Sequence, residues 1–80
     1  MKVTEYFKSM QRRPDRIGIK MDWIETTVQR PIKRQVQADG RIRCWSKIEG
    51  EDGKYLRVIL LEDGETVHNA FFDRNFKELE

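Results

Sequence analysis

Residues that form covalent bridges and metal sites are scarce in this sequence. Its 80 residues include one cysteine, Cys44, and one histidine, His68. A single thiol cannot close a disulfide within the chain, and a zinc site needs more Cys and His ligands than are present. We therefore expect no metal site and no bound cofactor. The low cysteine content is typical of a reducing compartment.

Long hydrophobic runs are also absent. The longest, residues 58–61, is far short of the ~20 residues that a membrane helix needs. No apolar run follows Met1, so we expect no signal peptide. Hydrophobic residues make up 38% of the chain, which is enough for a modest core at this length. We expect one cytoplasmic domain without a membrane partner.

The charges are distributed unevenly along the chain. Residues 1–47 contain twelve Lys and Arg against five Asp and Glu, whereas residues 48–80 contain four against nine. If the fold separates the two halves, one face is basic and attracts phosphate groups or acidic partners. If packing interleaves them, the surface is only highly charged.

The first part of the chain predicts a short helix at about residues 3–12. Val3, Tyr6, Phe7 and Met10 recur at helical spacing, which is typical of an amphipathic helix with one apolar stripe. Pro14 follows the stripe, and the residue before a proline is disfavoured in the helical conformation. The helix therefore ends before it.

A second helix is predicted at about residues 22–30. Asp22 is followed three residues later by Glu25, the spacing of a capping box in which both side chains satisfy free backbone N–H groups. Ile24 and Val28 then share one face, and Pro31 ends the helix.

The remainder predicts an antiparallel sheet over about residues 33–72, followed by a polar tail at 73–80. Asp39-Gly40 and Asp63-Gly64 each separate two extended runs, which indicates two-residue hairpins with positive φ at both central residues. The fold class is α+β, with two short N-terminal helices packed on three or four strands. A two-residue loop at Asp39-Gly40 would pair Val36 with Arg43.

The second hairpin predicts which side chains share a face. With Asp63-Gly64 as a two-residue turn, Leu60 pairs with Val67 and Leu56 with Phe71. The predicted core face consists of Leu56, Val58, Leu60, Val67 and Phe71. The opposite face consists of Tyr55, Arg57, Ile59, His68, Ala70 and Phe72. Arg57 and His68 are then diagonal neighbours, within reach of one phosphate.

His68, Arg57 and Arg74 are the candidate catalytic residues. Cleavage of RNA needs a group that moves the 2′-hydroxyl proton, which suits histidine, and cations that hold the phosphate, which suits arginine. Arg41, Arg43 and Lys77 are the candidate nucleic-acid-binding residues. The alternative is a strand histidine covered by Phe72, with arginines that only solvate the sheet.

The two tryptophans have a structural and a functional interpretation, and the cysteine has a structural one. Trp23 and Trp45 are suited to base stacking, but aromatic residues in so small a domain more often cover the core. Cys44 is expected to pack as a small apolar residue.

The order of the segments resembles a known family. Residues 12–16 (Arg-Arg-Pro-Asp-Arg), 22–31, 39–45 and 55–74 (YLRVILLEDGETVHNAFFDR) resemble the bacterial domain of unknown function 4258 over roughly residues 5–77. That family is in turn similar to RelE-like and BrnT-like toxins of toxin–antitoxin pairs. These toxins are ribonucleases, free or dependent on the ribosome, with a basic sheet face.

The resemblance implies a toxin-like ribonuclease with RNA or the ribosome as substrate and a small antitoxin-like partner protein. It also implies that Arg57, His68 and Arg74 are the site residues. The alternative hypothesis is a non-enzymatic interaction domain, or a degenerate toxin relative, that binds a small partner protein. The two differ in whether these three residues converge on an open basic surface.

Overall fold

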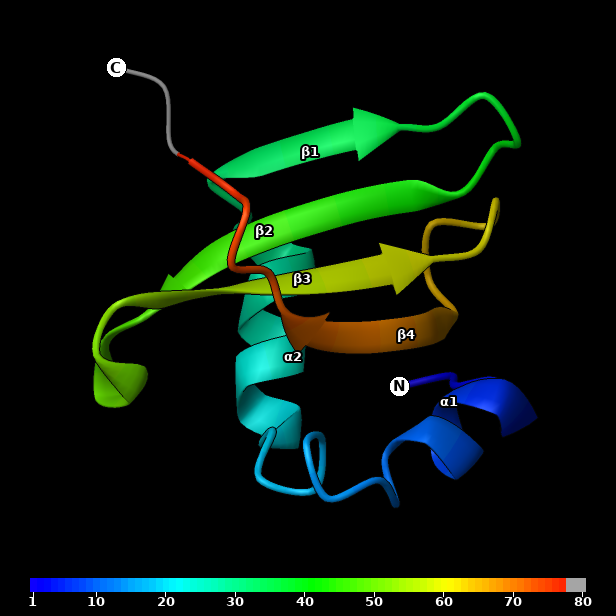
Figure 1. The fold of residues 1–80 in the computed structure, drawn as a ribbon. Coiled ribbons are helices and arrows are strands. Elements are labelled where there is room, and N and C mark those ends of the chain that lie inside the picture. Colours follow the sequence, from blue (N-terminus) through cyan, green and yellow to red (C-terminus); the bar gives the residue numbers. More distant parts are fainter. Residues whose placement is uncertain (78–80) are drawn as a thin grey trace.

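The computed structural model describes residues 1–77 and shows two helices against a four-stranded antiparallel sheet (Figure 1). The elements, in chain order, are α1 (Glu5–Met10), α2 (Met21–Gln29), β1 (Lys33–Val36), β2 (Ile42–Ile48), the 3-10 helix η1 (Glu49–Glu51), β3 (Lys54–Leu60) and β4 (Val67–Phe72). The strands lie in the order β1-β2-β3-β4. The α+β prediction is confirmed. The predicted polar tail includes residues 78–80, which lie outside the described part.

Helix α1 is shorter than predicted because Thr4 caps it. The Thr4 hydroxyl accepts the backbone N–H of Phe7 at 3.0 Å, and the helix begins at Glu5. Val3 lies before the cap and forms an isolated parallel bridge with Val67. Of the predicted apolar stripe only Phe7 is buried.

Helix α2 begins earlier than predicted, so the capping box is wrong. Its N-cap is Lys20, which makes no side-chain capping bond, and Asp22 already lies in the first turn. In this position its carboxylate interacts favourably with the positive end of the helix dipole. Ile24 and Thr27 are fully buried, and the Thr27 hydroxyl donates to the Trp23 carbonyl at 2.7 Å.

The first hairpin has a three-residue loop, and the predicted pairing of Val36 with Arg43 is wrong. Val36 pairs with Ile42, and the Gln37 N–H donates to the Arg41 carbonyl at 2.7 Å. Gly40 has a φ of 89°, but Asp39 does not adopt a positive φ. The loop therefore has one residue with positive φ, Gly40 at its end, where two such residues were expected.

The second hairpin starts with the predicted pairing, but its turn is not the predicted one, because Gly64 has a φ of 70° and Asp63 does not adopt a positive φ. The pairing then shifts. Leu60 pairs with Val67, but Ile59 pairs with Asn69, so that His68 is an extra residue in a β-bulge. From the bulge onward the predicted pairing of Leu56 with Phe71 is wrong, because Leu56 pairs with Phe72.

The bulge moves three residues to the face opposite the predicted one. Ala70, predicted on the open face, is fully buried, and Phe72 packs against the core. Phe71, predicted in the core, pairs with Arg57 on the opposite face. Leu56, Val58, Leu60 and Val67 are buried as predicted.

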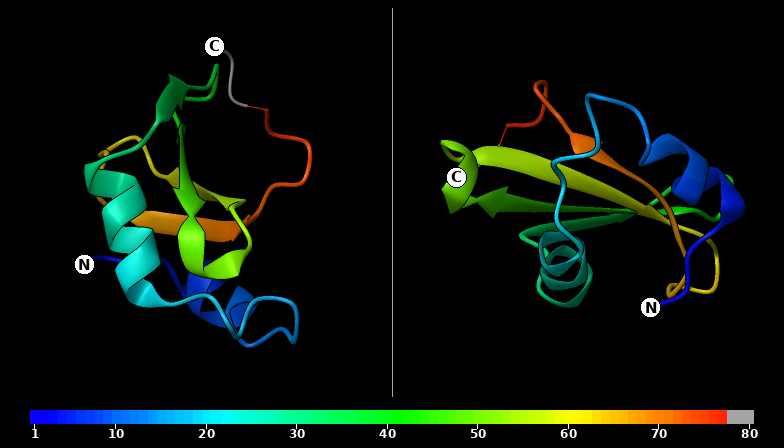
Figure 2. Two further views of the ribbon diagram at one scale, coloured as in Figure 1. Left: turned by 90° about the vertical axis from the view of Figure 1, so that its left-hand side faces the viewer. Right: turned by 90° about the horizontal axis from the view of Figure 1, so that it is seen from below.

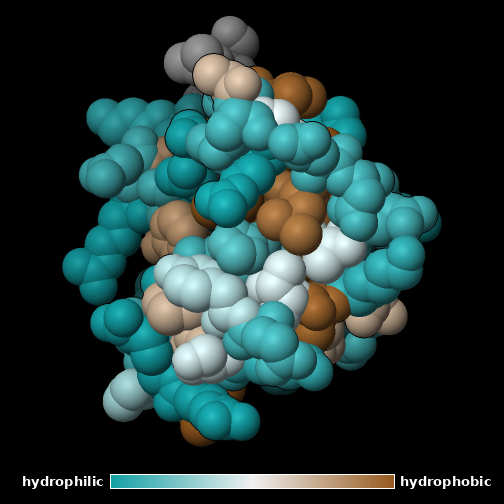
Figure 3. All heavy atoms as spheres, turned by 90° about the vertical axis from the view of Figure 1, so that its right-hand side faces the viewer, coloured by the Kyte–Doolittle hydropathy of each residue, from teal (hydrophilic) through white to brown (hydrophobic). Residues whose placement is uncertain are grey.

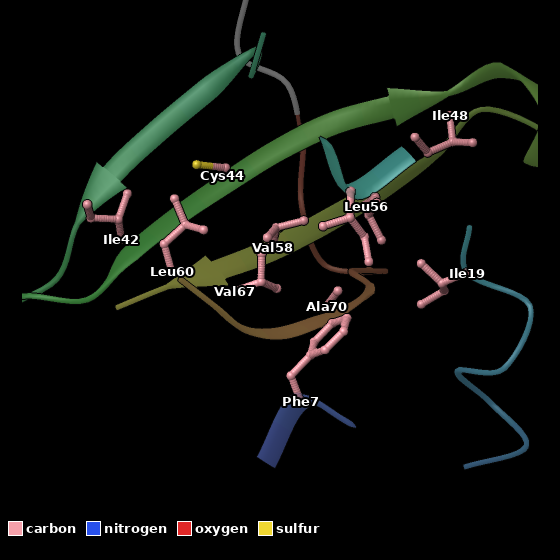
Figure 4. Close-up of a cluster of buried hydrophobic side chains, with 11 residues drawn as sticks. Phe7, Ile19, Ile42, Cys44, Ile48, Leu56, Val58, Leu60, Val67 and Ala70 are labelled. Carbon is pink, nitrogen blue, oxygen red and sulfur yellow. The ribbon is translucent and has the colours of Figure 1, made fainter. Parts of the chain in front are cut away.

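The core lies between the sheet and the helices (Figures 1 and 2). Helix α2 packs on β2 and β3, and α1 packs against β4. The core residues are Phe7, Ile19, Ile24, Ile42, Cys44, Ile48, Leu56, Val58, Leu60, Val67 and Ala70, most of them labelled in Figure 4. Cys44 is fully buried, which confirms that it packs as an apolar residue.

Candidate functional site

The sheet face opposite α2 carries most of the cationic side chains of the strands. The register places Gln35, Arg43, Ile59 and Asn69 in one row across the sheet, and Lys33, Trp45, Arg57 and Phe71 in the next. Side chains alternate between the two faces along a strand, so Lys47 in β2 and Arg41 directly before β2 lie on the same face as Arg43. We call it the basic face.

His68 lies at the end of the basic face near α1, and its position results from the bulge. Its Nδ1 is 3.1 Å from the Thr4 hydroxyl, and its ring stacks on Tyr6 with centroids 4.7 Å apart. Thr4 therefore joins the start of α1 to the bulged residue of β4. This end of the molecule is mainly hydrophilic, with small apolar patches between the polar side chains (Figure 3).

A shallow hollow of about 380 Å³ opens beside the His68 ring. It is lined by Tyr6, Gln37, Asp39, Arg41, Ile59, His68 and Asn69. Burial and then the positive charge of Arg41 lower the pKa of His68 below 6.5. This favours the neutral ring, which holds a lone pair that can accept a proton.

Arg41 and Arg43 are positioned by the first hairpin. Asp39 Oδ1 accepts the Arg41 backbone N–H at 3.0 Å, and the Arg41 side chain is exposed. In the amide orientation that satisfies both groups, the Gln37 oxygen accepts from Arg43 Nη2 at 2.6 Å and Nε at 2.9 Å. Arg41 is thus the cation of the His68 hollow, and Arg43 is held beside it.

Arg57 lies at the centre of the basic face and points away from His68. Its guanidinium lies 5.6 Å from the Trp45 ring and 5.3 Å from the Phe71 ring. Its Nη1 is 3.5 Å from Asp73 Oδ2, and its buried Nε has no hydrogen-bond partner. Burial, followed by the charge of Arg43, lowers the pKa of Arg57, although Asp73 opposes this.

The expected diagonal contact between Arg57 and His68 is wrong. Arg57 pairs with Phe71, three positions along β4 from His68, which corresponds to about 10 Å at ~3.3 Å per residue. Arg74 lines a different hollow of about 870 Å³, together with Arg16 and Lys54. The structure therefore does not bring His68, Arg57 and Arg74 together.

Several residues that shape the site were missed by sequence reasoning. Arg16 reaches β4, where its Nη1 donates to Asn69 Oδ1 at 2.8 Å, and its guanidinium lies 5.1 Å from the Phe71 ring. Asn69 Oδ1 also accepts the Ala70 N–H, which supports the chain just after the bulge. Only Thr4 had a local signal, because threonine is a typical N-cap and the apolar residues Tyr6 and Phe7 follow it within one turn.

Residues 1–77 contain neither a membrane-spanning helix nor a cluster of metal ligands. No helix there is both long and apolar enough to cross a membrane. No group of three or more His, Cys, Asp and Glu side chains in the same range is placed to hold a metal ion. Comparison of the chain with protein-family models, curated proteins and solved structures finds no match.

Proposed function

We propose that this chain is a toxin-like ribonuclease, similar in function to RelE-like and BrnT-like toxins, that binds RNA on its basic face and cleaves it at His68. The observation that carries the proposal is the hollow in which the neutral His68 ring and the Arg41 side chain lie together. Arg41 takes the place beside His68 that the sequence suggested for Arg57.

The chemistry follows from the partners of the His68 ring. In the tautomer with the proton on Nδ1, the Thr4 hydroxyl oxygen accepts both this N–H and the Phe7 N–H, for which it has two lone pairs. Nε2 then carries the lone pair that accepts the proton of an RNA 2′-hydroxyl.

The reaction is an internal transfer at phosphorus. The 2′ oxygen bonds to phosphorus as the bond from phosphorus to the 5′ oxygen breaks, which leaves a 2′,3′-cyclic phosphate. His68 returns its proton to the departing 5′ oxygen, so no proton is gained or lost. Arg41 holds the charge that develops on the phosphate oxygens.

The test is expression of the wild type in bacteria, with growth and mRNA integrity as readouts. His68→Ala should reduce cleavage by ~10²–10⁴, the usual contribution of a general acid–base group. Arg41→Ala should weaken RNA binding and reduce its salt slope by about one phosphate contact. Arg30→Ala removes an exposed arginine from the C-cap of α2, on the other side of the sheet, and should have little effect.

Two results would decide against the ribonuclease. The first is harmless wild-type expression with intact mRNA, both free and on ribosomes. The second is cleavage that survives in the His68→Ala variant. Equal effects of Arg41→Ala and Arg30→Ala would show that the hollow is not where RNA binds.

One observation favours the interaction-domain alternative. All four residues of β1 are exposed, and within residues 1–77 no strand pairs with its outer edge. An edge strand of this kind can take up a strand from a partner. A small antitoxin-like protein encoded by the adjacent reading frame should then copurify after co-expression and raise the melting temperature. Recovery of the free chain alone would contradict this.

A further inference from the structure

The C-terminal segment, residues 73–77, crosses the basic face of the sheet (Figures 1 and 2). It lies on the side opposite α2, in front of β3 and β2 in Figure 1. The Asp73 N–H donates to the Tyr55 carbonyl at 2.9 Å, and beyond this bond residues 74–77 form no helix or strand. The segment is therefore attached to the sheet mainly through side chains.

Two of its side chains meet the centre of the basic face. The Phe76 ring stacks on Trp45, with centroids 4.9 Å apart and planes 19° apart, and also contacts the Tyr55 ring at 5.0 Å. Asp73 Oδ2 accepts from Trp45 Nε1 at 3.0 Å and lies 3.5 Å from Arg57 Nη1. A flat ring on an indole and an anion on an arginine are the contacts that a nucleotide makes through its base and its phosphate.

The surface beneath the segment is suited to a nucleotide. Each of the two strands beside Trp45 contributes a cation: Lys33 Nζ lies 5.8 Å and the Arg57 guanidinium 5.6 Å from the Trp45 ring. Proteins that bind single-stranded nucleic acid combine such aromatic rings with cations along the backbone path. We call Trp45 and Arg57 the platform.

Arg57 has binding capacity that the segment leaves unused. Its contact with Asp73 is long, 3.5 Å, and its buried Nε has no partner. A guanidinium offers five N–H donors in a planar fork, which matches a phosphate better than one distant carboxylate oxygen. A phosphate that presents two oxygens to the guanidinium can therefore replace Asp73, which presents only Oδ2, with a gain in hydrogen bonds.

We propose that the platform is a nucleotide subsite for single-stranded RNA, and that Asp73 and Phe76 occupy it in the free protein as internal mimics of a phosphate and a base. RNA enters when the C-terminal segment leaves the face. The choice of RNA as ligand rests on the proposed function, but the platform is distinct from the His68 hollow, whose lining includes neither Trp45 nor Arg57.

Masking by the segment predicts a measurable penalty on binding. When only a fraction of molecules has an open platform, the apparent dissociation constant exceeds the intrinsic one by the inverse of that fraction. Phe76→Ala removes the stacked ring and so opens the platform. If about one wild-type molecule in ten has an open platform, RNA should bind the variant roughly tenfold more tightly. Asn75→Ala is the matched control, because Asn75 is exposed in the same segment.

The test uses a 2′-O-methyl RNA hexamer, which His68 cannot cleave, and the fluorescence of Trp45. All proteins carry Trp23→Phe, because Trp23 lies against Phe72 at the core side of the sheet and would obscure the signal. We expect Phe76→Ala to bind about tenfold more tightly than Asn75→Ala, with stronger quenching of Trp45. Adding Arg57→Gln to Phe76→Ala should abolish the gain.

Equal affinities for Phe76→Ala and Asn75→Ala would overturn the proposal, as would a gain in affinity that leaves Trp45 fluorescence unchanged. Should Phe76→Ala fail to fold, as judged by circular dichroism, deletion of residues 75–80 gives the same comparison. Binding without cleavage of ordinary RNA would remove the ribonuclease and leave the platform. Cleavage of RNA without a gain in affinity in the Phe76→Ala variant would keep the ribonuclease and remove the platform.

Discussion

Thr4 links helix α1 to the histidine of the site, so its hydroxyl should matter more than that of an ordinary surface threonine. The oxygen accepts the Phe7 N–H at 3.0 Å and lies 3.1 Å from His68 Nδ1. Thr4→Val keeps the shape of the side chain but removes both hydrogen bonds. Loss of an N-cap costs ~1 kcal/mol, and loss of a hydrogen bond costs about 0.5–1.5 kcal/mol.

The expected total is therefore roughly 1.5–2.5 kcal/mol, a large share of the ~5–15 kcal/mol by which small domains are stable. In a domain of this size each kcal/mol lowers the melting temperature by ~4–8 °C, so Thr4→Val should melt about 6–20 °C below wild type. Thr4→Ser keeps the hydroxyl and should melt close to wild type. The assay is thermal unfolding followed by circular dichroism.

A double-mutant cycle separates the two hydrogen bonds. In a His68→Ala background, Thr4→Val loses only the cap, so its effect should fall to about 1 kcal/mol. The reasoning would be refuted if Thr4→Val and Thr4→Ser melted within about 2 °C of each other. An effect of Thr4→Val that is the same with and without His68 would show that the contact with the ring contributes nothing.

Three further outcomes are expected. Val58 is fully buried, so Val58→Asp should unfold the domain, since an unpaired buried charge costs several kcal/mol. Val36 is 60% exposed, so Val36→Asp should melt near wild type. Hydrogen bonds from Thr66 lower the pKa of Asp63 from 3.8 to about 2; the stability this contributes is present above pH 3.8 and lost as the pH falls toward 2, so urea unfolding of wild type and Asp63→Asn should converge there. Because the pKa of His68 is lowered below 6.5, the folded state binds that proton less readily; stability should fall as the pH drops below 6.5, less so in His68→Ala, and cleavage should fall with it.

The helices and the hairpins were predictable where the signal is local. The apolar stripe around Phe7, the proline after the second helix and the Asp-Gly turns each act within a few residues of the chain. The helix starts were predicted less well, because a capping box at Asp22 and a cap two residues earlier compete for the same backbone N–H groups. The structure uses Lys20, without a side-chain cap.

The site was predictable in its residue types but not in its arrangement. Histidine and arginine were the expected groups, and the alternation of the strands placed them on one face. A single bulged residue at His68 then moved Phe71 opposite Arg57 and turned Ala70 into the core. A register shift of one residue moves each later side chain to the other face, and no local pattern in residues 65–72 indicated it.

The sequence by itself determined the class of fold and the four aliphatic residues at the centre of the core, because turn chemistry and apolar alternation act over short distances. Tertiary structure alone decided which cations have which partners. Thr4 meets His68 across 64 positions of the chain, and Arg16 meets Asn69 across 53. Asp73 and Phe76 lie over Trp45 for the same reason: contacts between distant segments depend on how the elements pack, and packing leaves no periodic signal in the chain.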